Sequence, residues 1–401
     1  MQNYLTDRYI VIDDLTLEVS SGLPQGSILG PLCWNVAYDK VVNLITEPAS
    51  SKTAFADDLG VIVSGNNSWD LKKASGKVTK QIGDVLREKD LTLEPAKSEA
   101  LIFGNLYKIS SVLVDDVRIR SSELLKYLGV WLSRKDLNFD SHIKLACEKA
   151  QKNIRSLSCL MPLSKGPSFL RKKLIFSSVL SALLYGLPTW HHDAKKRGNI
   201  RLIEKTLRPM KLRLCSAYRT VSERCLEVIS GFPPIQLMIE ERLRRHEKRE
   251  NFTEIKQDIV HQWCDLWLSS SPSKDVWFKK LVPNIEEWIY RSNKMETDFF
   301  LTQLLTGHGN FKYYLFRFTL AQSPNCIFCT REVIDDARHT FFECDRFLRS
   351  KLELEADLGE EFCVENFQKI ITKNLSAWCR VKRYVKDILT IKTLVFNALD
   401  P

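Results

Sequence analysis

Two neighbouring acidic residues, Asp57 and Asp58, stand between two short apolar runs of the chain, residues 54–56 and 59–63. The spacing leaves no room for a helix, so it predicts a β-hairpin that presents two carboxylates at its turn. Paired carboxylates can hold Mg²⁺, which takes one or two of them and completes its shell with water and substrate phosphates. Acidic dipeptides are also frequent in ordinary turns, so an ordinary turn is the alternative interpretation.

A glycine-rich loop precedes this acidic pair. Residues 22–27 read Gly-Leu-Pro-Gln-Gly-Ser, and Gly26 stands 31 residues before Asp57. Glycine and the small Ser27 let the backbone come close to a flat ligand, and the Gln25 amide can both donate and accept a hydrogen bond. A plain Gly/Pro loop without a ligand is the alternative.

A third group of residues has the spacing of a metal site. Three cysteines and one histidine follow the pattern Cys-x2-Cys-x9-His-x4-Cys, and they are Cys326, Cys329, His339 and Cys344. Thiolate and imidazole donors at this spacing can close a tetrahedral Zn²⁺ site, and no ligand position is left open, so we expect a structural zinc. Cys363 and Cys379 could substitute as ligands, and a set of buried free thiols is the alternative.

Positive charge is concentrated in one stretch of the chain. The 401 residues carry 59 Lys and Arg against 49 Asp and Glu, a formal net charge of +10. Residues 195–224 contain ten basic and two acidic residues, a net charge of +8. This concentration favours a polyanionic partner, nucleic acid rather than a membrane, because no long apolar segment accompanies it. A merely solvated helical face is the alternative.

Apolar residues within 195–224 predict a helix pair with one buried and one basic face. A second segment, residues 311–318, interleaves aromatic and basic residues, which suits base stacking with phosphate contact, although such a run is more often a packed helix. The candidate nucleic-acid contacts are Lys195, Lys196, Arg197, Arg201, Lys312 and Arg317. Binding through these residues should weaken steeply with salt.

Local patterns indicate the elements that must position these residues. The β-type runs are residues 10–12, 16–19, 59–63, 101–103 and 112–114, and the helical segments among them are residues 31–44 and 68–91. This mixture indicates an α+β region. Beyond it, apolar residues spaced three and four apart predict a helix over residues 143–161, and helices dominate to about residue 300. The break at Ser269–Pro272 is the best linker candidate.

Together these segments resemble the reverse transcriptase of non-LTR (LINE-type) retrotransposons. Four motifs carry the resemblance in one order: the Gly22–Pro31 loop, Phe55-Ala56-Asp57-Asp58, the run Leu-Thr-Leu-Glu-Pro-Ala-Lys-Ser-Glu at 91–99, and Lys126-Tyr127-Leu128-Gly129-Val130. The Cys/His motif and residues 304–318 before it also resemble the segment that follows the polymerase in these elements. The resemblance implies a partial right-hand polymerase palm with an antiparallel sheet and helices, a helical thumb and connector, and a small zinc-bound C-terminal region.

The same resemblance implies roles for the motif residues. Asp57 and Asp58 would hold Mg²⁺ in a two-metal nucleotidyl transfer, with Asp58 the weaker ligand, and Lys97 would neutralise the leaving pyrophosphate. The template and nucleotide loop would contain Gly22, Pro24, Gln25, Gly26 and Ser27, and the primer grip Tyr127, Leu128 and Gly129. The implied partners are an RNA template, a DNA primer or target, and deoxynucleoside triphosphates, with no membrane.

One family motif has no match in this chain. In the family a further aspartate, on a strand before the glycine-rich loop, completes the metal site, and the acids Asp7, Asp13, Asp14 and Glu18 lack its surroundings. We therefore expect the C-terminal part of a longer polyprotein, without its N-terminal portion and endonuclease, that is nearly inactive alone. We expect it inside the cell, in the nucleus at the site of integration and partly in the cytoplasm.

These expectations define three domains and a function. Residues 1–133 are the partial palm, 134–270 the helical thumb and basic connector, and 273–401 the nucleic-acid-binding region with the zinc motif at 326–344. The predicted function is RNA-directed DNA polymerisation primed at a nicked chromosomal target. The alternative is a nucleic-acid-binding module, derived from such an element, that performs no catalysis.

Overall fold

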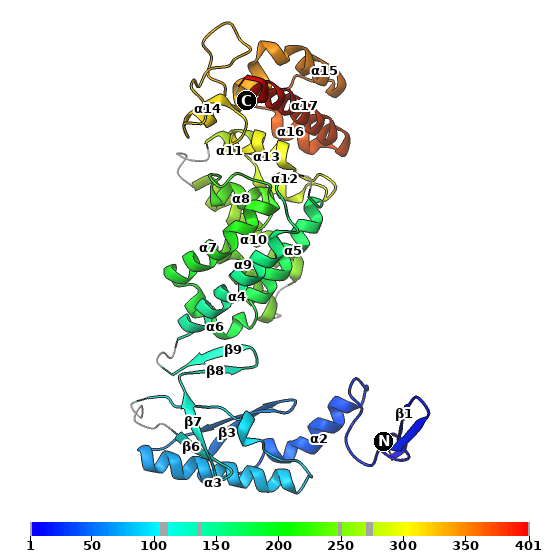
Figure 1. Cartoon of the computed structure of the whole chain (residues 1–401), viewed down its shortest axis with the longest axis vertical. Helices are drawn as coiled ribbons and strands as arrows, with labels where there is room; N and C mark the ends of the chain where they lie inside the picture. Colours follow the sequence, from blue (N-terminus) through cyan, green and yellow to red (C-terminus); the bar gives the residue numbers. More distant parts are fainter. Residues whose placement is uncertain are drawn as a thin grey trace. The chain divides into compact units, whose positions relative to one another are not determined.

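The computed structural model describes residues 2–104, 111–134, 138–164, 166–247, 251–269 and 276–399. The chain divides into two compact units, Met1–Leu137 and Asn138–Pro401 (Figure 1). All named strands lie in the first unit and the second is built of helices, so the α+β class is confirmed. The expected linker after Ser269 lies outside the described residues, and residues on both sides of it belong to the second unit.

The first unit alternates short hairpins with two longer helices. Its elements are α1 (Gln2–Leu5), β1 (Tyr9–Ile12), β2 (Leu15–Glu18), α2 (Gly30–Val42), β3 (Ser50–Phe55), β4 (Asp58–Val63), α3 (Ser68–Arg87), a 3₁₀ turn (Pro95–Lys97), β5 (Ala100–Leu101), β6 (Ser111–Val114), β7 (Val117–Ser122), β8 (Leu124–Tyr127) and β9 (Val130–Ser133).

The antiparallel sheet that we expected in the first unit is divided into smaller sheets. Among the described residues the strands form four small sheets, β1–β2, β3–β4, β5–β7–β6 and β8–β9. Three of these are antiparallel hairpins, whereas β5 pairs with β7 in parallel. In this sheet β5 lies on one edge of β7, and β6, the antiparallel partner of β7, lies on the other.

The core of the first unit lies between α2, α3 and the β3–β4 hairpin. Tyr38 and Val41 of α2 are buried against Val78, Ile82 and Val85 of α3, whose spacing of four and three places them on one helix face. Apolar side chains of both hairpin strands pack against this cluster. Each fully buried aliphatic side chain contributes about 1.5–3 kcal/mol, so this cluster fixes the hairpin against the two helices.

The ends of α3 follow from its sequence. The Asn67 side chain accepts hydrogen bonds from the backbone amides of Trp69 and Asp70, which satisfies two amides at the helix start. The helix ends at Arg87 rather than at residue 91 as expected. Asp90 takes a left-handed conformation (φ 55°), and the Leu91 amide bonds back to the Leu86 carbonyl, which closes the helix.

The second unit is a succession of helices. They are α4 (Asp140–Ser158), α5 (Phe169–Leu183), α6 (Leu187–Ala194), α7 (Arg197–Leu214), α8 (Glu223–Ser230), α9 (Ile235–Glu247), α10 (Phe252–Ser269), α11 (Val276–Leu281), α12 (Ile285–Tyr290), α13 (Phe299–Thr306), α14 (Lys312–Phe316), a π-helical turn (His339–Glu343), a 3₁₀ turn (Asp345–Phe347), α15 (Leu348–Leu358), α16 (Phe367–Lys373) and α17 (Leu375–Leu399).

One hydrophobic core runs through the second unit, from Ile143 in α4 to Leu389 in α17. The predicted apolar stripe is confirmed in α4, where Ile143, Cys147 and Ile154 are buried.

No single described helix has the length and apolar composition to cross a membrane. Helices α5 and α6 have them only when taken together, and a bend of 87° separates the two. Trp190 of α6 is buried in the core.

The basic stretch does not form the expected helix pair with one basic face. Residues 195–224 contain the single full helix α7 and only the first residues of α8. Lys211 is fully buried, and its ammonium group lies 2.6 Å from the Glu223 carboxylate and 3.6 Å from that of Glu227. One of the ten basic side chains therefore faces inward, because two acids of the next helix neutralise it.

Candidate functional site

The acidic pair occupies the turn of the β3–β4 hairpin, as predicted. Phe55 pairs with Asp58, so Ala56 and Asp57 form a two-residue turn. Ala56 has a φ of 53°, a conformation that costs a non-glycine residue free energy and persists where neighbours enforce it. The side chains of Asp57 and Asp58 are exposed, so both carboxylates can reach a ligand.

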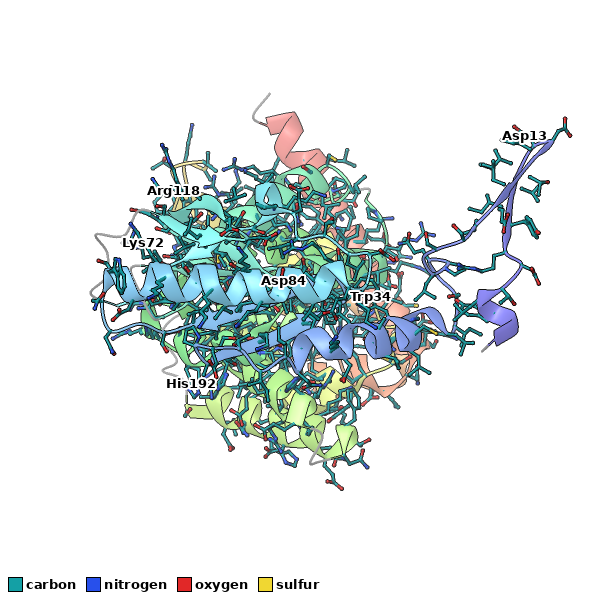
Figure 2. All side chains as sticks on the ribbon, turned by 90° about the horizontal axis from the view of Figure 1, so that it is seen from below. Asp13, Trp34, Lys72, Asp84, Arg118 and His192 are labelled. Atoms are coloured by element: carbon teal, nitrogen blue, oxygen red, sulfur yellow. The ribbon has the colours of Figure 1, made fainter. Side chains whose placement is uncertain are left out.

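Helix α2 supports this turn from one side. The indole Nε1 of Trp34 (Figure 2) donates a hydrogen bond of 2.9 Å to the Ala56 carbonyl oxygen. The Trp34 ring stacks on Tyr38, with 5.2 Å between the ring centroids. Burial raises the pKa of Tyr38, and the negative charge of the nearby Asp57 carboxylate raises it further. Sequence reasoning missed both aromatics, although their spacing of four in a helix is a readable signal.

Two other hairpins of the first unit also carry acidic pairs at their turns. Asp13 (Figure 2) and Asp14 lie between β1 and β2. Asp115 and Asp116 lie between β6 and β7, and they pair with Arg87 at 2.9 Å and Lys80 at 3.2 Å. Asp57 and Asp58 form no ion pair with a described residue. Their charge therefore remains available to a cation, and the helix support distinguishes their turn from the Asp13 turn.

The glycine-rich loop is held by its own hydrogen bonds. Gly22 and Gly26 have φ values of 80° and 86°, which only glycine adopts without strain. The Ser27 hydroxyl accepts a hydrogen bond of 3.2 Å from the Gly30 amide at the start of α2, and it also contacts the Tyr4 hydroxyl. Pro24, Gln25 and Gly26 are exposed. The loop thus offers Gln25 to a ligand, while Ser27 anchors it to α2.

One of the expected primer-grip residues, Tyr127, lies against the β3–β4 hairpin. Leu128 and Gly129 form the two-residue turn between β8 and β9, both with positive φ (46° and 85°). Tyr127 lies against β4, because a Cβ atom at Gly60 would stand 3.2 Å from the Tyr127 hydroxyl and 3.2 Å from the Thr53 methyl group. The absence of a side chain at Gly60 therefore lets the β8–β9 hairpin pack against β4.

Lys97 ends the 3₁₀ turn Pro95–Lys97 and is exposed. The Glu94 side chain starts this turn by accepting a hydrogen bond from the Ala96 amide. Within the described residues no hydrogen bond or ion pair joins Lys97 to Asp57 or Asp58. The structure therefore gives the position of Lys97 but does not bring it together with the acidic turn.

The four predicted metal ligands come together in the second unit, and their ligand atoms all lie within 4.8 Å of one another. The Cys329 sulfur lies 3.5 Å from His339 Nε2 and 3.7 Å from the Cys344 sulfur, and the Cys326 and Cys344 sulfurs are 3.9 Å apart. A tetrahedral zinc with bonds of about 2.3 Å to sulfur and about 2.0 Å to nitrogen requires edges of about 3.8 Å and about 3.5 Å. The group can therefore hold a metal ion. Cys363 and Cys379 do not belong to it.

Local structure positions each ligand of this group. Asn325 and Ile334 form an isolated bridge, and the Cys326 amide donates to the Val333 carbonyl at 2.8 Å, which closes the loop that carries Cys326 and Cys329. The π-helical turn begins at His339 and ends before Cys344. A hydrogen bond to Cys326 and burial raise the pKa of the Cys344 thiol, because two thiolates at this distance repel each other without a cation.

A buried ion pair connects the metal group with α17. Lys392 Nζ lies 2.6 and 2.7 Å from the two Asp335 carboxylate oxygens and 2.9 Å from the Thr340 hydroxyl. The side chains of Lys392 and Asp335 are 1% and 3% exposed. Asp335 also accepts a hydrogen bond of 2.8 Å from the Lys312 amide at the start of α14. This pair joins the ligand loop, α14 and α17.

The candidate nucleic-acid contacts differ in their surroundings. Lys195, Arg197, Arg201 and Arg317 are exposed. Lys196 lies 2.8 Å from Asp193 and 3.3 Å from Asp140, which neutralise it. The Lys312 ammonium lies over the Phe396 ring, 4.5 Å from its centroid.

Comparison with known proteins gives these features a family context. Residues 2–132 match the family described as "Reverse transcriptase (RNA-dependent DNA polymerase)". The chain is 21% identical over 388 residues to the "Retrovirus-related Pol polyprotein from type-1 retrotransposable element R1 2" of Nasonia vitripennis, an alignment that covers 88% of this chain and 93% of that protein. No solved structure matches the chain.

Longer relatives align with only part of their length. The chain is 23% identical over 353 residues to the "Putative 115 kDa protein in type-1 retrotransposable element R1DM" of Drosophila melanogaster, covering 81% of this chain and 34% of that protein. It is 26% identical over 199 residues to the "RNA-directed DNA polymerase from mobile element jockey" of the same species, covering 47% of this chain and 22% of that protein. The chain therefore spans about a third or less of these two relatives.

Proposed function

Since this chain belongs with the reverse transcriptases of non-LTR retrotransposons, we propose that it contributes the acidic turn and the C-terminal region of an RNA-directed DNA polymerase that acts in target-primed reverse transcription. The observation that carries this proposal is the β3–β4 turn within the matched segment. Its two exposed carboxylates have no ion-pair partner among the described residues, and Trp34 supports the turn. The family match favours this function over a binding module without catalysis. We propose that the chain acts in the nucleus at the integration site and is partly cytoplasmic.

In the proposed reaction the primer 3′-hydroxyl oxygen attacks the α-phosphorus of a deoxynucleoside triphosphate. A new phosphorus–oxygen bond forms, the bond to the β-phosphate oxygen breaks, pyrophosphate leaves, and the hydroxyl proton passes to solvent. Mg²⁺ held at the turn would supply stabilisation of the charge on the phosphate oxygens and activation of the hydroxyl. Asp57 is the proposed ligand and Asp58 a weaker one, and both suit a hard cation because they offer exposed oxygens.

The other motif residues have supporting roles in this proposal. Lys97 neutralises the pyrophosphate, the loop around Gln25 contacts the template and the nucleotide, and Tyr127 with its turn holds the primer end. A further carboxylate, from the upstream part of the polyprotein, would complete the two-metal site. We propose 1–133 as the partial palm, 134–270 as thumb and connector, and 273–401 as the nucleic-acid-binding region.

We also propose that the Cys/His group holds one structural Zn²⁺. The edge lengths of the group fit a tetrahedral site, and three sulfurs with one nitrogen are the donor set that zinc prefers. Bound zinc would neutralise the thiolates, while Cys326, Cys329, His339 and Cys344 would tie the ligand loop to the π-helical turn.

Primer extension on an RNA template tests the polymerase proposal. With the upstream polyprotein sequence restored, Asp57→Asn should lower synthesis at least about a hundredfold, since removal of one electrostatic stabiliser costs about that much. Asp13→Asn, in the exposed acidic turn between β1 and β2, is the matched control and should keep wild-type synthesis. Residues 1–401 alone should give almost none. Wild-type synthesis by Asp57→Asn would refute the assignment of Asp57.

A further inference from the structure

Two segments that lie far apart in the sequence meet at the surface of the second unit. The Thr220 hydroxyl, in the connection between α7 and α8, lies 2.9 Å from His308 Nδ1 and 2.7 Å from the Tyr314 hydroxyl. The ring of Tyr218 contacts that of Tyr314, with 5.9 Å between the centroids. These contacts join the end of the basic stretch to the aromatic segment that precedes the metal group (α14 in Figure 1).

The joined surface carries a series of aromatic rings. Tyr314 is almost buried and stacks on His308, with 5.0 Å between the centroids and 26° between the ring planes. Phe318 packs on Tyr314 at 5.1 Å. The outer rings remain open to solvent, since Tyr313 is 42%, Phe316 45% and Phe318 42% exposed. Clustered exposed aromatics on a buried anchor indicate a binding surface rather than ordinary surface residues.

The two segments that form this surface carry charge of a single sign. Residues 205–222 and residues 306–323 contain neither Asp nor Glu. Arg219 stands beside Thr220, and Arg317 stands between Phe316 and Phe318. Both arginines are exposed, and neither forms an ion pair with a described residue. Cations interleaved with aromatic faces complement a strand with phosphates on its backbone and flat bases on its side.

We propose that this surface, Tyr218–Thr220 with His308–Leu320, stacks the unpaired bases of single-stranded RNA. A duplex covers the faces of its bases, so exposed rings can stack only on an unpaired strand. The choice of RNA rests on the proposed function, since an RNA-directed polymerase carries an RNA template as its long single strand. Phe316 and Phe318 provide exposed aromatic rings for stacking, and Arg219 and Arg317 provide positive charges for the phosphates.

Fluorescence anisotropy with the full chain tests this proposal. The probe is a labelled, unstructured RNA of about 16 nucleotides, which matches the upper site size of such surfaces. Phe316→Ala/Phe318→Ala should raise the Kd about tenfold or more, because stacking on an aromatic ring contributes strongly for each base. The same double variant should bind an abasic strand of equal length and charge as tightly as the wild type does. Tyr185→Ala, which removes an exposed ring elsewhere in the second unit, is the matched control and should stay within about twofold.

A second variant, measured on both the intact and the abasic strand, separates contacts to phosphates from stacking on bases. Arg317→Gln should reduce the salt dependence of binding by about one unit of slope, for intact and abasic strands alike. Any of three results would overturn the proposal. The double phenylalanine variant could bind intact RNA with unchanged affinity, it could lose as much affinity for the abasic strand as for the intact strand, or the wild type could bind the matching DNA strand more tightly than the RNA. Primer extension by Asp57→Asn tests the polymerase assignment, whereas RNA binding by the double phenylalanine variant tests this surface, so failure of the one is measured separately from failure of the other.

Discussion

The indole Nε1 of Trp34 donates a hydrogen bond of 2.9 Å to the carbonyl oxygen of Ala56, the residue directly before Asp57. This bond ties the acidic turn to α2, which starts at the end of the glycine-rich loop. Because Ala56 holds a strained positive φ, the turn needs an external contact to keep its conformation. Trp34 is therefore a positioning residue for the two carboxylates.

Trp34→Phe tests this role, since phenylalanine keeps the stacking on Tyr38 and removes only the donor. Loss of one hydrogen bond of about 1 kcal/mol should lower the rate of primer extension by about fivefold, with little change in KM. Trp69→Phe, at an exposed indole of α3, is the control and should leave the rate unchanged. An equal effect of both substitutions would contradict the positioning role.

The buried pair of Lys392 and Asp335 predicts a large loss of stability when it is broken. Lys392→Met leaves the Asp335 carboxylate buried without its cation, which should cost about 3–5 kcal/mol of unfolding free energy in a denaturant titration. Adding Asp335→Asn should recover part of the loss, because no unpaired charge remains. Lys386→Met, at an exposed position of the same helix, should change stability by less than about 0.5 kcal/mol.

Glu227 predicts a pH dependence of stability. Burial raises the pKa of Glu227 to about 7 from 4.5, against the opposing effect of Lys211. Glu227 therefore binds a proton more tightly in the folded state than in the unfolded state. The stabilisation of the folded state by this proton is complete below pH 4.5 and is lost as pH rises through about 7. Relative to Glu227→Gln, the wild type should lose up to about 3 kcal/mol across this window, at about 1.4 kcal/mol per pKa unit.

Thermal or denaturant unfolding at several pH values measures that difference. The exposed Glu254→Gln is the matched control and should follow the wild-type curve. Parallel curves for the wild type and Glu227→Gln from pH 4.5 to 7 would show that Glu227 does not titrate in this range.

Metal removal should affect the C-terminal part of the second unit. Metal analysis should find one zinc per chain, and chelation should expose the segment around residues 324–347 to protease, because the ligands tie its two halves together. Cys329→Ser should abolish the bound zinc, whereas Cys363→Ser should keep it. Equal zinc content in both variants would contradict the ligand assignment.

The parts that sequence could predict are those with local causes. The acidic hairpin and the Cys/His group depend on residues close in the chain, so local patterns predicted the turn at Asp57 and the grouping of Cys329 with the three other ligands. The support of the turn by Trp34 depends on how α2 packs, and the burial of Lys211 depends on two acids in the next helix. Charge counting grouped Lys211 with the other basic residues of 195–224, because the sequence alone does not show its tertiary neighbours.

Metal-specificity rescue tests the central claim, that Asp57 is a ligand of the catalytic cation, most directly. In the polyprotein with the upstream sequence restored, Asp57→Cys should lose primer extension with Mg²⁺ and regain a substantial part with the softer Mn²⁺ or Cd²⁺, because thiolate ligands prefer softer cations. Asp13→Cys should work equally well with each metal that supports the wild type. Wild-type extension by Asp57→Cys with Mg²⁺ alone would contradict the claim.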